Sequence, residues 1–139
     1  HELPGQRLFQ YLDEDGSTLA IDSEDVNAYI RAVTGEAFSA KDFRTWGATV
    51  LAAIELHTLG PADTPAECKR KEIEAVRRVA AALGNTQTVT RAYYIHPAIF
   101  AAYENGILFQ AMQRAALEVT DDPAGLDIAE TAVTWTLQQ

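Results

Sequence analysis

Apolar residues at helical spacing, interrupted by glycine and proline, constrain this chain of 139 residues more than any other feature. The clearest run begins with Phe43 and Trp46 and is interrupted at Gly60-Pro61. Residues three and four positions apart share one face of a helix, so this run predicts an amphipathic helix that ends before the glycine. Ser39 is its expected N-cap, and Asp42 lies near its positive end.

A second helix is marked at both ends. Thr64-Pro65-Ala66-Glu67 combines an N-cap, a proline at the first helical position and a capping-box glutamate. Apolar residues continue at helical spacing to Leu83, and Gly84 is the expected C-terminal glycine. The same kinds of end signal, an N-cap residue and a C-terminal glycine, predict another helix that starts at Ser23 and ends at Gly35.

The two ends of the chain carry weaker patterns. Four apolar residues near the N-terminus share helical spacing and predict a short first helix: Leu8, Phe9, Tyr11 and Leu12. Turn-forming residues come after them, which leaves room for one small hairpin near residues 13–21. A helix is expected to start near His96-Pro97, and Gly106 and the Pro123–Gly125 segment divide the rest of the chain into helical stretches.

Together these patterns predict a mainly α, compact multi-helix domain that comprises residues 1–139, with 106–139 as a helical C-terminal segment. Hydrophobic residues make up 47% of the chain, enough for a core. No apolar run approaches the ~20 residues that span a membrane. One cysteine, Cys68, excludes an internal disulfide and fits a reducing cytosol. Because the sequence does not begin with Met, we expect a fragment of a longer protein.

The acidic charge is unevenly distributed. The net charge is −9, which disfavours nucleic-acid binding if it is spread evenly. Residues 41–91, however, hold eight basic and six acidic groups, so this segment is +2 and the flanks together are −11. The pattern permits a local anion site in the middle of the chain.

Three short motifs contain the residues that could do chemistry: Lys41-Asp42-Phe43-Arg44-Thr45-Trp46, Leu83-Gly84-Asn85-Thr86, and Arg91-Ala92-Tyr93-Tyr94-Ile95-His96-Pro97. Each is ordinary when taken alone. Arg44 could be a solvated or ion-paired helix residue, Asn85 could belong to a turn after a helix end, and Tyr94 could be a core residue. Spacing alone leaves the chain as a helical domain.

Taken together, the motifs resemble the catalytic domain of type IB DNA topoisomerases. That family has a Lys-Asp-Leu/Phe-Arg-Thr-Trp/Tyr motif, then a Gly-His or Gly-Asn turn. Its nucleophilic tyrosine comes nine residues after that His or Asn, and Tyr94 comes nine residues after Asn85. The resemblance covers residues 3–105, and the flanks at 8–16 and 25–29 look like the bacterial, poxvirus-like branch. Register favours Tyr94 over Tyr93.

The resemblance implies a mechanism and assigns roles. Such enzymes relax supercoiled DNA: a tyrosine attacks a backbone phosphate, a 3′-phosphotyrosyl link forms, and the free 5′-hydroxyl later reverses it. Tyr94 would be the nucleophile, and Arg44 and Asn85 would donate hydrogen bonds to the phosphate oxygens. The resemblance suggests a phosphate contact for Lys41, which could instead be a surface lysine. Arg91, three residues before Tyr94, could also reach the DNA backbone. No ATP or metal is required, because the covalent intermediate keeps the bond energy.

The resemblance also implies that part of the active site is missing. The family uses a second arginine and a lysine general acid on a β-hairpin, both upstream of the Lys-Asp-Phe-Arg motif. Before Lys41 the chain has only Arg7 and Arg31 as Lys or Arg residues. We therefore expect both groups in an N-terminal part of the same protein, and we expect this fragment alone to be inactive.

Two other functions fit the sequence less well. Tyrosine recombinases share the fold and the spacing to the tyrosine, but they have His three residues before the arginine, where this chain has Lys41. A non-catalytic acidic helical interaction module would fit the net charge. The expected partner is double-stranded DNA, with no membrane, for a monomer in the cytoplasm at the bacterial nucleoid.

Overall fold

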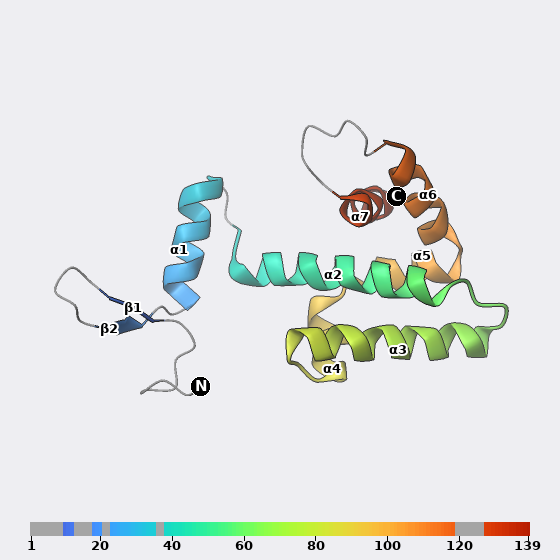
Figure 1. The fold of residues 1–139 in the computed structure, drawn as a ribbon, viewed down its shortest axis with the longest axis horizontal. Coiled ribbons are helices and arrows are strands. Elements are labelled where there is room, and N and C mark those ends of the chain that lie inside the picture. Colours follow the sequence, from blue (N-terminus) through green and yellow to red (C-terminus); the bar gives the residue numbers. More distant parts are fainter. Residues whose placement is uncertain (1–9, 13–17, 21–22, 36–37, 119–126) are drawn as a thin grey trace. The chain divides into compact units, whose positions relative to one another are not determined.

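The computed structural model describes residues 10–12, 18–20, 23–35, 38–118 and 127–139 (Figure 1). The chain divides into two compact units, residues 1–43 and 44–139. No helix in the described ranges is both long and apolar enough to cross a membrane.

The first unit contains a two-stranded hairpin. Strand β1 (Gln10–Leu12) pairs antiparallel with β2 (Thr18–Ala20), with Tyr11 opposite Leu19. The predicted hairpin is therefore present, with strands on either side of the turn-forming residues. The predicted first helix is wrong at Tyr11 and Leu12, which lie in β1, whereas Leu8 and Phe9 lie outside the described residues. A few apolar residues cannot distinguish the two structures, and strand pairing satisfies the backbone here.

Helix α1 (Ser23–Thr34) comes after the hairpin, and Gly35 ends it with a left-handed φ of 68°. This confirms the predicted helix. A left-handed residue after the last turn stops a helix, and glycine adopts that conformation without steric cost.

Helices α2 (Ala40–Leu59) and α3 (Pro65–Leu83) have the ends that the sequence predicts. The Asp42 carboxylate accepts hydrogen bonds from the Ser39 backbone N–H at 2.7 Å and from its hydroxyl at 2.8 Å. Thr64 accepts from the Glu67 backbone N–H at 3.2 Å. The Glu67 carboxylate differs from the predicted capping box, because it accepts from Asp63 N rather than from the cap residue.

Five shorter helical segments complete the second unit. They are α4 (Gln87–Val89), the π-helical segment η1 (Thr90–Tyr94), α5 (Ala98–Glu104), α6 (Ile107–Glu118) and α7 (Ile128–Leu137). The predicted break at Gly106 is confirmed, with a φ of 73°. Asp127 and Glu130 form a reciprocal capping box at the start of α7.

The core of the second unit lies between α2, α3 and the C-terminal helices. Helix α3 runs back along α2 (Figure 1), and Arg78 of α3 pairs with Glu55 of α2 at 2.8 Å. The Trp46 indole N–H donates to Glu130 at 3.4 Å and so connects α2 with α7. The largest fully buried side chains come from every long helix of this unit: Leu56, Ile99, Leu108, Val79 and Val133, with Thr49 and Thr90.

We expect Leu56→Ala to destabilise the fold strongly. Leu56 is 0% exposed, and truncating a fully buried leucine typically lowers the free energy of unfolding by about 2–5 kcal/mol. Urea unfolding of the chain measures this. Leu117, which is 81% exposed on α6, gives the matched control, since Leu117→Ala should change stability by less than about 0.5 kcal/mol. Equal effects of the two changes would contradict the placement of Leu56 in the core.

Candidate active site

Arg44 connects two of the predicted site elements. Its Nη2 donates to the Leu83 carbonyl oxygen at 2.9 Å, at the C-terminal end of α3. Its guanidinium carbon lies 5.0 Å from the centroid of the Tyr94 ring. Asn85 is two residues beyond Leu83, so one side chain of α2 contacts both the turn with Asn85 and the segment with Tyr94. The structure thus brings together elements that are 39 positions apart in sequence.

Arg44 differs from most of its basic neighbours in having no carboxylate partner within the described part of the chain. Five of the eight basic residues in 41–91 form ion pairs with glutamates: Arg70, Lys71, Arg77, Arg78 and Arg91. Arg44 is exposed and donates to a backbone carbonyl instead. Its positive charge is therefore available to an anion, and its planar group can offer further donors to a phosphate.

Asn85 has an unused hydrogen-bond donor. Gly84 ends α3 in the left-handed conformation, with a φ of 67°, and the Asn85 backbone N–H donates to the Ala80 carbonyl at 3.0 Å. The side-chain Nδ2 is buried and has no partner within the described residues. Buried polar groups are nearly always hydrogen-bonded, so this donor is available to an acceptor that a ligand or a water molecule supplies.

Tyr94 is the last residue of the π-helical segment η1. The Ile95 backbone N–H donates to the Thr90 carbonyl at 3.1 Å, a bond across five residues. Such turns are rare and often occur at functional sites. Tyr94 is half-buried against Arg44, whereas the neighbouring Tyr93 is 64% exposed. The two adjacent tyrosines therefore have different surroundings, and Tyr94 is the one next to the unpaired cation.

Thr49 is a residue at this site that the sequence analysis missed. It is almost fully buried on α2, and its hydroxyl lies 2.7 Å from the Thr45 carbonyl and 3.4 Å from the Tyr94 carbonyl. The His96 backbone N–H donates to the same hydroxyl at 3.1 Å. Thr49 thus fixes the backbone on the C-terminal side of Tyr94. A threonine between apolar neighbours in a buried helix was the only sequence signal for this role.

The structure places the two expected DNA-contact residues differently. Lys41 is exposed in the first turn of α2. Arg91 instead directs its guanidinium inward: Nη2 lies 3.0 Å from Oε2 of Glu72, and the guanidinium carbon lies 4.1 Å from the centroid of the Phe100 ring.

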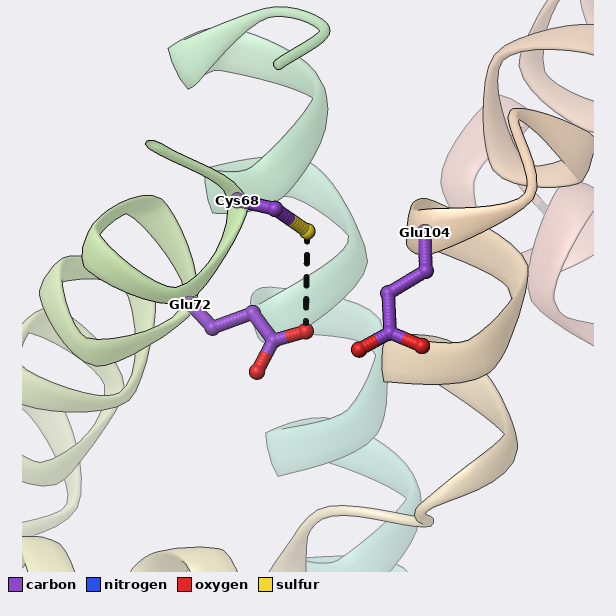
Figure 2. A group of neighbouring side chains, drawn as sticks. All are labelled: Cys68, Glu72 and Glu104. Atoms are coloured by element: carbon purple, nitrogen blue, oxygen red, sulfur yellow. Dashed lines mark hydrogen bonds between the residues drawn. The ribbon is translucent and has the colours of Figure 1, made fainter. Parts of the chain in front are cut away.

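Glu72 also belongs to a group of side chains that could hold a metal ion. Cys68 and Glu72 of α3 and Glu104 of α5 point toward one another (Figure 2), and their ligand atoms lie within 4.8 Å of one another. Burial, and then the carboxylates of Glu72 and Glu104, raise the pKa of the Cys68 thiol. The thiol therefore keeps its proton at neutral pH and donates weakly to Glu72 at 3.9 Å. These residues line a cavity of about 990 Å³, to which Arg91 also contributes.

Two comparisons with known proteins bear on this arrangement. Residues 1–120 match the family described as eukaryotic DNA topoisomerase I, catalytic core. The DNA topoisomerase 1B of Acanthamoeba polyphaga mimivirus is 34% identical over 111 residues, which cover 75% of this chain and 33% of the viral protein. The chain thus spans about a third of the length of this curated relative.

Proposed function

This chain belongs to the type IB DNA topoisomerase family, and on that premise we propose that it is the C-terminal part of a catalytic domain that relaxes supercoiled DNA. The Tyr94 hydroxyl attacks a backbone phosphate of one DNA strand. A bond forms between the phenolic oxygen and phosphorus, and the bond to the 5′-oxygen breaks. The 5′-hydroxyl later attacks the phosphotyrosyl link and restores the strand. The matching family model and the viral relative both carry topoisomerase descriptions, which favours this function over a tyrosine recombinase.

The contact between Arg44 and Tyr94 carries this proposal. A tyrosine hydroxyl is a poor nucleophile until its proton is lost or its phenolate is stabilised. A guanidinium 5.0 Å from the ring centroid, with no carboxylate partner in the described ranges, is suited to binding the phosphate that Tyr94 attacks. It also stabilises the negative charge that develops on the phosphate oxygens in the transition state.

Asn85 supplies a second, neutral donor to the phosphate. Its Nδ2 is buried and unpaired among the described residues, so a non-bridging oxygen would satisfy it. The family motif that this chain resembles has histidine or asparagine at this position. Asparagine keeps the hydrogen bond but does not titrate near neutral pH, so the donor strength of this residue is independent of pH there.

The leaving 5′-oxygen needs a proton. We propose that an N-terminal part of the same protein supplies a lysine general acid and a second arginine. Two observations support this: the chain spans about a third of its viral relative, and its only Lys or Arg residues before Lys41 are Arg7 and Arg31. Lys41, exposed at the start of α2, is proposed to contact the DNA backbone.

The remaining features of the enzyme are also proposals. Transesterification conserves the bond energy, so neither ATP nor a metal is needed. The residues at 8–16 and 25–29 support the bacterial, poxvirus-like branch of the family. A cytoplasmic monomer at the nucleoid, acting on double-stranded DNA, is consistent with that branch. Relaxation of plasmid DNA by the longer protein, in a chelator and without ATP, tests the cofactor proposal.

We expect Tyr94→Phe to abolish the covalent protein–DNA adduct, because the change removes only the attacking oxygen. In a suicide substrate the short leaving fragment that carries the 5′-hydroxyl dissociates, so religation cannot occur and the adduct of the longer protein is trapped for gel analysis. Tyr93→Phe is the matched control and should keep the adduct, since that ring is largely exposed. Loss of the adduct with Tyr93→Phe and its retention with Tyr94→Phe would show that the other tyrosine is the nucleophile.

Asn85→Ala should slow single-turnover cleavage by roughly 10²–10³-fold, the scale for losing one transition-state donor. Asn85→His should retain much of the rate, because it restores a donor, and should make the rate depend on pH near neutrality. Quenched-flow or manual sampling of the adduct measures both. A rate for Asn85→Ala close to that of the unaltered protein would remove Asn85 from the active site.

The 139-residue chain alone should not relax supercoiled plasmid, because it lacks the proposed general acid and second arginine. The longer protein, tested at the same concentration, provides the positive control in an agarose-gel assay. Efficient relaxation by the isolated chain would contradict the proposal that its active site is incomplete.

A further inference from the structure

We propose that Glu72 is a positioning residue for Tyr94, acting through Arg91, and that the pair braces the π-helical segment η1 against α3. This inference rests on the proposed function, in which Tyr94 is the nucleophile. It gives Arg91 a role different from the DNA contact suggested by the sequence. The carrying observation is the Glu72–Arg91 ion pair, which joins the middle of α3 to η1 three residues before Tyr94.

Glu72 is placed where a charge requires a partner. It is 4% exposed, on the buried face of α3 beside Ala75 and Val76. Moving a carboxylate out of water is costly unless an opposite charge and hydrogen bonds compensate for it. Arg91 provides the charge at 3.0 Å, whereas the contact with the Cys68 thiol is long, at 3.9 Å. The position of Glu72 therefore restrains the position of Arg91.

Arg91 is restrained on a second side. Its guanidinium stacks over the Phe100 ring of α5 at 4.1 Å. Helix α3 and helix α5 thus both contact one side chain of η1. Arg91 is itself 45% exposed, but its ion pair with the buried Glu72 carboxylate and its cation–π contact are both directional, so together they restrain the segment.

Tyr94 consequently lies between two restraints. Arg91 holds the start of η1, and the Thr49 hydroxyl holds the backbone at Tyr94 and His96. π-Helical turns are uncommon and depend on their surroundings. An attacking oxygen must be aligned with the phosphate, and a small displacement can lower the rate by about 10²-fold. Loss of the Glu72–Arg91 ion pair should therefore lower the rate of DNA cleavage.

Two roles for Arg91 can be distinguished: a ligand of a DNA phosphate, and a positioning residue that acts together with Glu72. The Glu72 carboxylate already neutralises the Arg91 charge, so binding a phosphate would compete with a buried partner. A phosphate ligand contributes to DNA affinity and to its salt dependence, at about 0.9 in the logarithmic slope for each phosphate. A positioning residue contributes neither to DNA affinity nor to its salt dependence, and its effect on the cleavage rate depends on Glu72.

The test uses Glu72→Gln, Arg91→Gln and the double variant in the longer protein. Single-turnover cleavage of a suicide substrate is measured at saturating DNA and well below the unfolding midpoint. Affinity and its salt slope are measured for each change in a Tyr94→Phe background. We expect each single change to lower the cleavage rate by roughly 10- to 100-fold. The double variant should be no slower than the slower single variant, because the two residues act as one unit.

Affinity and salt slope should be unchanged in all three variants. Glu118→Gln and Arg114→Gln, which remove an exposed ion pair on α6 with a separation of 2.7 Å, control for charge and should leave the rate unchanged. The double variant also guards against misfolding, because it leaves no buried charge unpaired.

Three results would contradict the proposal that the Glu72–Arg91 pair positions Tyr94. One is a lower affinity and a smaller salt slope for Arg91→Gln while Glu72→Gln cleaves normally, which would make Arg91 a phosphate ligand. Another is a normal cleavage rate in every variant with only a lower melting temperature, which would make the pair merely structural. The third is strictly additive effects of the two changes. Failure of the proposed function itself is separate, since it would appear as an adduct retained by Tyr94→Phe.

Discussion

The contact that Arg44 makes with both Leu83 and Tyr94 organises the candidate site. One guanidinium nitrogen is fixed by a backbone carbonyl at the end of α3, and the planar group lies beside the Tyr94 ring. A lysine could not make both contacts in the same way, because it lacks the planar fork. Since the anchor is a neutral carbonyl rather than a carboxylate, the contact that positions the cation leaves its charge available to an anion.

The sequence predicted the helices well where local residues determine their ends. The Thr64 cap and the left-handed Gly84 depend on backbone groups only a few residues away, so their types and spacing are informative. The N-terminal segment shows the limit. Tyr11 lies in a strand because it pairs with the residue opposite it in β2, and spacing along one segment cannot report a partner across a turn.

The sequence singled out Arg44, Asn85 and Tyr94 as candidate site residues, but it gave no indication of the contacts that hold them. The spacing from Asn85 favoured Tyr94 over Tyr93 as the candidate nucleophile, but no motif indicated that η1 would be π-helical or that Thr49 would contact it. Those contacts join residues 45 and 47 positions apart. The Glu72–Arg91 pair, 19 positions apart, is similar: its residues look like ordinary helix-surface charges until α3 and η1 are packed together.

The distribution of charge bears on how an acidic chain would take part in the proposed DNA cleavage. Most basic residues in 41–91 are neutralised by glutamates within the described ranges, so they stabilise helices α2, α3 and η1 rather than attract a polyanion. General affinity for the DNA backbone grows with the number of phosphates neutralised, and this part of the chain offers few free cations for that purpose. Arg44 is suited to one local phosphate. Under the proposed function, the N-terminal part would hold the duplex, because the described part of this chain has few free cations, while Tyr94 performs the attack.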